Sequence, residues 1–131
     1  MKKVEITILV NDIKETATLH ISRAKAAITF SMKNGFRKKY EDQDLYCCLA
    51  KIREDNPHIV FLCKGSKLNV MPSRMCSQMA GGVVAYEMKI GMPATFDDIV
   101  HIFDYEDNDI VKTLQEQINF YKEWLLSLDR E

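Results

Sequence analysis

Alternation of apolar and polar residues dominates the first forty positions of the chain. Residues 4–10 read V-E-I-T-I-L-V, which places one apolar face on an extended, β-branched segment. A similar alternation recurs twice, and the dipeptide Asn34-Gly35 accepts the positive φ angles of a tight hairpin turn. We therefore predict strands over residues 4–10, 16–22, 26–32 and 36–40, the last as a charged edge strand.

A spacing of three and four residues predicts two longer helices. Asp42 or Asp44 is placed to cap a helix that continues to about Asp55, with a buried stripe at Leu45, Cys48, Leu49 and Ile52. A second stripe covers about five turns near the C-terminus, at Ile110, Leu114, Ile118, Tyr121, Leu125 and Leu128. We expect this last helix to pack across the sheet, because an isolated helix of that length is marginal in water.

The segment Asn69–Pro93 follows neither period. Its 25 residues hold two of the three prolines, three of the five glycines and five of the seven methionines. We predict a helical turn beginning at Pro72-Ser73 whose flexible methionines, Met71, Met75 and Met79, fill the core. The segment then acts as a joint that brings an interior strand over 58–63 and a strand over 83–90 into one sheet.

A further helix start is predicted beyond this joint. Thr95 and Asp98 have the spacing of a capping box, which predicts a short helix continuing to Phe103. Together these elements predict a single α+β domain over residues 1–131. Its mixed or mainly antiparallel sheet has about five to six strands, with a long C-terminal helix and one central helix packed on it.

Composition agrees with a folded protein. Hydrophobic residues make up 47% and charged residues 28%, as in ordinary globular chains. The apolar run near the N-terminus is short and broken by Glu5, so we expect no secretory signal. No stretch approaches the ~20 apolar residues of a membrane span, and we expect a cytoplasmic protein.

Charge is distributed unevenly behind a net value of −1. Residues 1–96 carry 15 Lys or Arg against 9 Asp or Glu, whereas residues 97–131 carry 3 against 10. Six acidic residues lie within thirteen positions that contain no Lys or Arg: Asp97, Asp98, Asp104, Glu106, Asp107 and Asp109. They have three interpretations, namely helix-start residues, a metal site, or an anionic patch that competes for the basic surface of a partner. The spacing lacks the glycine and terminal glutamate of an EF-hand loop.

A basic cluster at Lys33, Arg37, Lys38 and Lys39 is interleaved with two aromatic residues, Phe36 and Tyr40. Cations alternating with stacking aromatics are typical of single-stranded nucleic-acid binders. A charged edge strand explains the same residues with fewer assumptions. Nucleic-acid binding therefore remains the alternative function, and we do not favour it.

Signals for catalysis are weak. His20, His58 and His101 are scattered, and the four cysteines form no CxxC pair or zinc-type cluster. The nearest approach to a nucleophile is Ser73 or Cys76 at the start of the predicted helical turn. We predict a protein that is not an enzyme, with no cofactor and no metal.

The stretch NVMPSRMCSQMAGGVVAYEMKIGMP, with FDDIVHIFDYE after it, resembles small bacterial immunity proteins of contact-dependent growth inhibition and other polymorphic toxin systems. The resemblance covers about the last 75 residues. It implies a cytoplasmic protein that binds and neutralises a cognate toxin domain, often a nuclease. From charge we predict that the six acidic residues bind this partner, for which a basic nuclease is the expected type.

Overall fold

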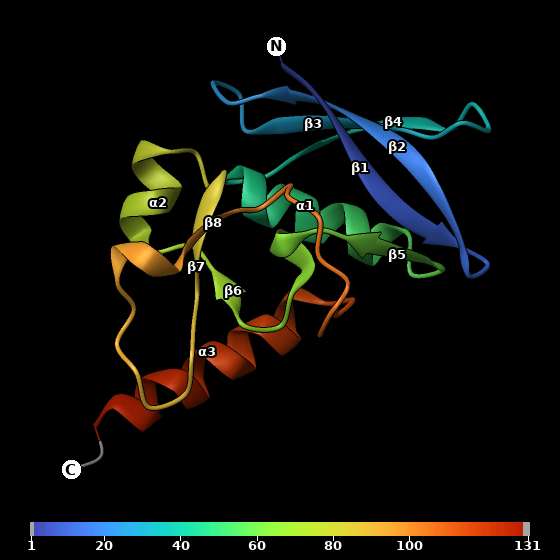
Figure 1. Cartoon of the computed structure of the whole chain (residues 1–131). Helices are drawn as coiled ribbons and strands as arrows, with labels where there is room; N and C mark the ends of the chain where they lie inside the picture. The colour runs from blue at the N-terminus through green and yellow to red at the C-terminus, as the bar shows by residue number, and fades with distance from the viewer. Residues whose placement is uncertain (1, 130–131) are drawn as a thin grey trace.

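Alternating residues at the N-terminus build the larger of two antiparallel sheets. The computed structural model describes residues 2–129. Within that range it contains a five-stranded sheet, a three-stranded sheet and three α-helices (Figure 1). The larger sheet has the strand order β4-β3-β2-β1-β5. Its strands are β1 Lys2–Val10, β2 Ile13–Ser22, β3 Ala27–Ser31, β4 Arg37–Glu41 and β5 Ile59–Leu62. The predicted α+β class is confirmed, and β4 is the edge strand expected from its charges.

The register of this sheet keeps its apolar side chains on one face. Ile6 is paired with Ala17, and Leu19 with Phe30, so that all four lie on the buried side. The same face is covered by helix α1, Leu45–Asp55. Figure 1 shows that no helix among the described residues covers the opposite face.

Helix α1 forms as the sequence predicts. Asp44 is its N-cap and accepts the backbone N–H of Cys47 at 2.7 Å. The predicted stripe of Leu45, Cys48, Leu49 and Ile52 is fully buried. Burial of four such side chains against the sheet supplies about 1.5–3 kcal/mol for each large one, which makes this helix the centre of the core.

The smaller sheet corrects the predicted joint. It consists of β6 Val70–Met71, β7 Val84–Glu87 and β8 Ile99–His101. Strand β5 pairs with β1 instead, because the 3₁₀ turn η1, Lys64–Ser66, redirects the chain immediately after it. Gly65 makes this turn possible, since a Cβ there would lie 2.7 Å from Leu49. The strands over 58–63 and 83–90 therefore belong to different sheets, and β5 is at the end of its own.

The methionine prediction is wrong in part. Helix α2 covers Arg74–Met79 and is capped by Ser73, as expected. Met75 and Met79 are 67% and 80% exposed, however, and Cys76 is the buried residue of this helix. The spacing of four does not extend back to Met71, because that residue lies in strand β6 rather than in the helix.

The capping box of Thr95 and Asp98 is present, but it opens a single 3₁₀ turn, η2 Phe96–Asp98. The predicted helix to Phe103 does not form. Instead β8 follows at once and pairs with β7, whose unpaired edge would otherwise be exposed. The β-branched residues Ile99 and Val100 favour this outcome.

Helix α3 covers Leu114–Leu128 and begins with a capping box of Thr113 and Glu116. Its buried residues are Gln117, Trp124 and Ser127 rather than the predicted stripe, of which Leu125 is exposed. The helix lies along β6 and not across the larger sheet (Figure 1). Its inward face is polar because it packs against loop backbone, which needs hydrogen-bond partners.

Two contacts attach the end of α3 to the loop that follows β7. Trp124 donates its indole N–H to the carbonyl of Met92 at 2.9 Å, and Ser127 Oγ accepts the N–H of Gly91 at 2.8 Å. The helix and this loop therefore form one unit. No helix within residues 2–129 is long and apolar enough to cross a membrane.

Candidate functional site

Residues 104–109, named here the acidic loop, connect β8 to the approach to α3. Backbone hydrogen bonds attach the loop along its whole length. Lys64 N–H donates to Asp104 O at 2.8 Å, Leu68 N–H to Asp109 O at 2.9 Å, and Glu106 N–H to Leu62 O at 3.3 Å. Because its backbone is paired, the loop presents its side chains in a fixed arrangement.

Glu106 is the one buried carboxylate of the acidic loop, with 8% of its surface exposed. Its Oε1 atom accepts hydrogen bonds from Lys64 Nζ at 2.9 Å and from Lys67 Nζ at 2.8 Å. Glu87 of β7 accepts from the same two lysines, each at 3.0 Å. Two cations and two anions thus form a compact, neutral cluster between the smaller sheet and η1.

This cluster changes the protonation behaviour of its members. The hydrogen bonds from Lys67 and then Lys64 lower the pKa of Glu106 to about 2. Burial alone raises the pKa of Glu87, but the two lysines outweigh it and lower the pKa. The second oxygen of Glu106 accepts the backbone N–H groups of residues 107 and 108, both at 3.0 Å. Glu106 is therefore ionised at neutral pH and shapes the turn that follows it.

The other three carboxylates of the loop are exposed. Asp104, Asp107 and Asp109 have no Lys or Arg nitrogen within 4.0 Å among residues 2–129. Asp109 has a φ of +56°, a conformation that Asp tolerates better than most residues. Three charges within six residues, fixed on a paired backbone, make an anionic surface of defined shape.

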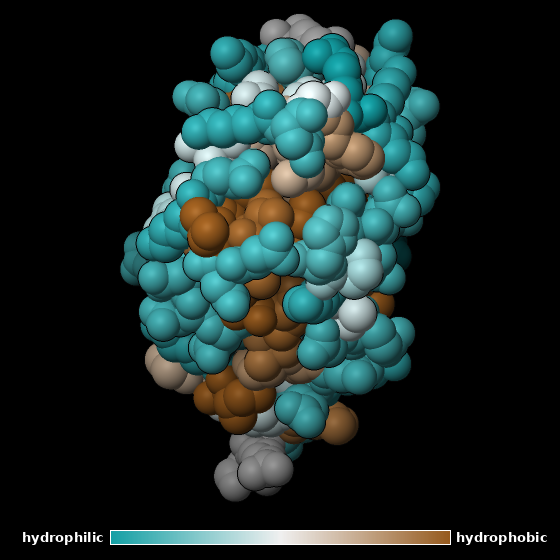
Figure 2. All heavy atoms as spheres, turned by 90° about the vertical axis from the view of Figure 1, so that its right-hand side faces the viewer, coloured by the Kyte–Doolittle hydropathy of each residue, from teal (hydrophilic) through white to brown (hydrophobic). Residues whose placement is uncertain are grey.

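Apolar side chains lie next to this surface. Tyr105 donates its hydroxyl to Asp107 at 3.3 Å and accepts from Lys14 Nζ of β2 at 2.9 Å. This contact places the turn between β1 and β2 beside the acidic loop, and Ile13 at that turn is 69% exposed. Asn11 and Asp12 both have positive φ, which gives the tight hairpin its shape. Figure 2 shows apolar atoms exposed among polar ones on the side where β5 and this hairpin lie.

The structure does not bring all six predicted acidic residues together. Asp97 is exposed and Asp98 is half-buried in η2, at the left of Figure 1, whereas the acidic loop lies beyond β8. Asp98 accepts the backbone N–H of Thr95 at 2.9 Å and lies 3.9 Å from Lys89 Nζ. The acidic residues therefore form two groups, of which the loop carries the larger charge.

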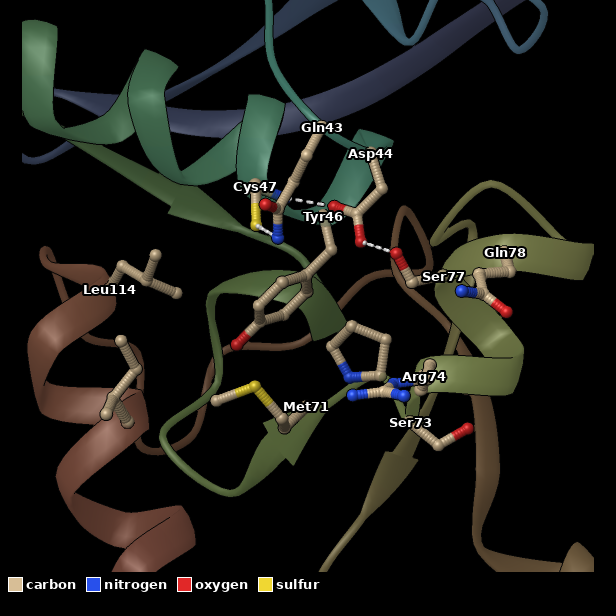
Figure 3. Close-up of a pocket in the computed structure, with 12 residues that line it drawn as sticks. Gln43, Asp44, Tyr46, Cys47, Met71, Ser73, Arg74, Ser77, Gln78 and Leu114 are labelled. Carbon is tan, nitrogen blue, oxygen red and sulfur yellow. Dashed lines mark hydrogen bonds between the residues drawn. The ribbon is translucent and has the colours of Figure 1, made fainter.

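A separate cleft of about 580 Å³ lies between the start of α1, helix α2 and the start of α3 (Figure 3). Tyr46, Met71 and Leu114 supply apolar surface, and Arg74 lies at its α2 side. The remaining lining residues are Gln43, Asp44, Cys47, Pro72, Ser73, Ser77, Gln78 and Ile118. The carboxylate of Asp44 accepts Ser77 Oγ at 2.5 Å, which ties α2 to α1.

The candidate nucleophiles lie in or near this cleft. Ser73 Oγ accepts the backbone N–H of Cys76 as a helix cap, and Cys76 is buried. Burial, and then the charge of Asp44, raise the pKa of Cys47 to about 12, so this thiol stays protonated at neutral pH. All four cysteines are unpaired by disulfide bonds.

The basic cluster is held differently from a stacking surface. Lys38 forms an ion pair with Asp55 at 3.0 Å, and Tyr40 is buried with its hydroxyl donating to the same carboxylate at 2.5 Å. Phe36 packs on Phe30 with ring centroids 5.9 Å apart. The two aromatic residues of this strand therefore face the protein rather than solvent.

The histidines also remain apart. His58 is exposed, and His101 Nδ1 accepts the backbone N–H of Phe103 at 3.3 Å. Among residues 2–129 no group of three His, Cys, Asp or Glu side chains is placed to hold a metal ion.

Sequence reasoning missed Ile13, Lys14 and Tyr105 as neighbours of the acidic residues. They are more than ninety positions apart in the chain at the Lys14–Tyr105 contact, and no local pattern indicates it. Comparison with models of known protein families and with curated proteins finds no match for this chain. Functional conclusions therefore come from the geometry of the site and from the sequence resemblance.

Proposed function

We propose that this protein is an immunity protein that binds a cognate toxin domain and neutralises it in the cytoplasm of the cell that makes both. One observation carries the proposal. Asp104, Asp107 and Asp109 are exposed on an anchored loop without a neutralising Lys or Arg within 4.0 Å in residues 2–129. The resemblance of residues 69–106 to bacterial immunity proteins supports the same function.

The chemistry of the surface favours a basic partner. Fixed carboxylates accelerate encounter with a positively charged protein, and the nucleic-acid face of a nuclease is such a surface. Ile13 and Tyr105 offer apolar area beside the charges, which is the arrangement of a buried contact centre with a polar rim. Inhibition then follows from occupation of the partner's surface and needs no catalytic group.

The six acidic residues have different roles in this proposal. Asp104, Asp107 and Asp109 contact the partner directly. Asp97 and Asp98, on the separate turn η2, contribute to long-range attraction. Glu106 holds the loop in shape through the two lysines.

The first experiment identifies the partner through the gene that adjoins this one. We expect that gene to encode a protein with a C-terminal toxin domain, and co-expression with the present chain to restore growth of cells producing that domain. A neighbouring product that is not toxic, or toxicity that persists on co-expression, would contradict the proposal.

The second experiment tests the surface. A triple variant, Asp104→Asn, Asp107→Asn and Asp109→Asn, is expected to associate about tenfold more slowly with the toxin domain, with a weaker dependence on salt. The matched control neutralises three exposed carboxylates elsewhere, Glu5→Gln, Glu41→Gln and Glu123→Gln, for the same change in net charge. Equal association rates for the two triple variants would remove the acidic loop from the interface.

A further inference from the structure

Arg53 of α1 is a buried cation, with only 2% of its surface exposed. Its Nη2 atom donates to Gln117 Oε1 at 2.6 Å, and its Nη1 atom donates to the carbonyl of Val111 at 3.3 Å. The Nε–H group finds no acceptor among residues 2–129. Both acceptors are neutral, so hydrogen bonding satisfies part of the guanidinium without compensating its charge.

No carboxylate forms an ion pair with Arg53 within the part of the chain that the structure describes. Glu54 and Glu116 are close enough to favour its charged form, but both are engaged elsewhere. Glu54 accepts the N–H of Leu114 at 3.2 Å, and Glu116 closes the capping box of α3. Burial of a cation without a paired anion costs several kcal/mol, which makes Arg53 an unusual core residue.

A small cavity adjoins this cation. It has a volume of about 70 Å³ and lies between β5 and residues 110–112. Lys112 is a second cation on its wall, and its exposed side chain donates to the carbonyl of Pro57 at 2.7 Å. The other lining residues are apolar: Ile59, Val60, Phe61, Ile110 and Val111. Two cations and no acidic side chain line a space larger than the roughly 30 Å³ that one water molecule occupies.

We propose that this cavity binds a small monovalent anion, of the size of chloride, between Arg53 and Lys112. The anion accepts from the guanidinium and supplies the charge that the protein around Arg53 lacks. A water molecule satisfies the same N–H group but carries no charge, so the two occupants differ in their dependence on halide. This site is distinct from the partner surface of the proposed function and does not depend on it.

The test measures halide binding directly on the full-length chain. The ³⁵Cl NMR signal of sodium chloride is expected to broaden with the wild-type protein, and sodium bromide should reverse the broadening saturably. Lys112→Gln removes one cation from the exposed wall, and we expect it to weaken binding about tenfold. Lys39→Gln, an exposed lysine on β4, is the matched control and should behave as the wild type does.

A second measurement locates the ion. Crystals grown in sodium bromide should show an anomalous peak next to the guanidinium of Arg53. Absence of saturable broadening in the wild type, equal binding by Lys112→Gln, or a bromide peak elsewhere would each overturn the proposal. Because Lys112 is exposed, its variant is expected to fold, so that a failure of Arg53 variants to fold does not affect the test.

Discussion

Lys67 Nζ lies 2.8 Å from Oε1 of Glu106, in a loop whose neighbouring carboxylates at Asp104 and Asp107 face solvent. One acidic residue of this loop therefore stabilises the fold, while those around it remain free to act on a partner. The division depends on burial, because only Glu106 is enclosed between the two lysines.

Glu106→Gln is expected to lower the free energy of unfolding by about 2–3 kcal/mol at pH 7, because it removes a buried charge from a hydrogen-bonded cluster. The measurement is equilibrium unfolding in urea. Asp104→Asn in the same loop is the control and should change stability by less than about 0.5 kcal/mol, since its side chain is exposed.

The stability difference between the wild type and Glu106→Gln is also expected to depend on pH. The folded pKa of Glu106 is lowered to about 2 from the ordinary 4.5. Its contribution is therefore fully present above pH 4.5 and is lost as the pH falls toward 2. Urea unfolding at several acidic pH values should show the gap between the two proteins closing, and a constant gap would contradict this account.

Gly82→Ala is expected to destabilise the protein by about 2 kcal/mol or more. Gly82 has a φ of +76°, and a Cβ atom there would lie 2.8 Å from Cγ of Asp44. Asp44 cannot move away without losing its bonds to Ser77 and Cys47. Gly35→Ala separates the two causes, because Gly35 has a φ of +96° but no atom within 4 Å of the added Cβ. Thermal unfolding should rank Gly82→Ala clearly below Gly35→Ala, and equal losses would exclude the steric cause.

Gln117→Ala is expected to cost about 3 kcal/mol or more in unfolding free energy. The amide of Gln117 donates to the carbonyls of Gly65 and Lys67, both at 2.9 Å, and accepts from Arg53. Its removal leaves these buried groups without partners. Gln115→Ala, at an exposed position of the same helix, is the control for helix propensity. If the two variants are equally stable in urea, the buried amide has no special role.

The sequence predicts the elements that depend on local chemistry. Alternation places the first four strands, and Asp44, Ser73, Thr95 and Thr113 all occupy caps in the structure. Three of these caps were predicted from side chains that accept backbone N–H groups within three residues. Such interactions are visible in the sequence because both partners are close in the chain.

The sequence does not predict the elements that depend on distant contacts. The apolar spacing of α3 indicated a face containing Leu125, but loop backbone around Gly65 and Met92 selects Gln117 and Trp124 instead. The same limit applies to the site, where the six acidic residues are adjacent in sequence. Strand β8 separates η2 from the acidic loop, and the hairpin beside Tyr105 comes from the other end of the chain.

The strand order of the larger sheet has a consequence for the path of folding. Strands β1 to β4 pair with their neighbours in sequence, whereas β5 reaches β1 through pairs such as Thr7 with Leu62. Closing that long intervening chain costs entropy before any contact rewards it. We expect the four-stranded meander to gain amide protection early in refolding and β5 to gain it later, with α1 in place between them. Pulsed hydrogen exchange that protects β5 as early as β2 would contradict this order.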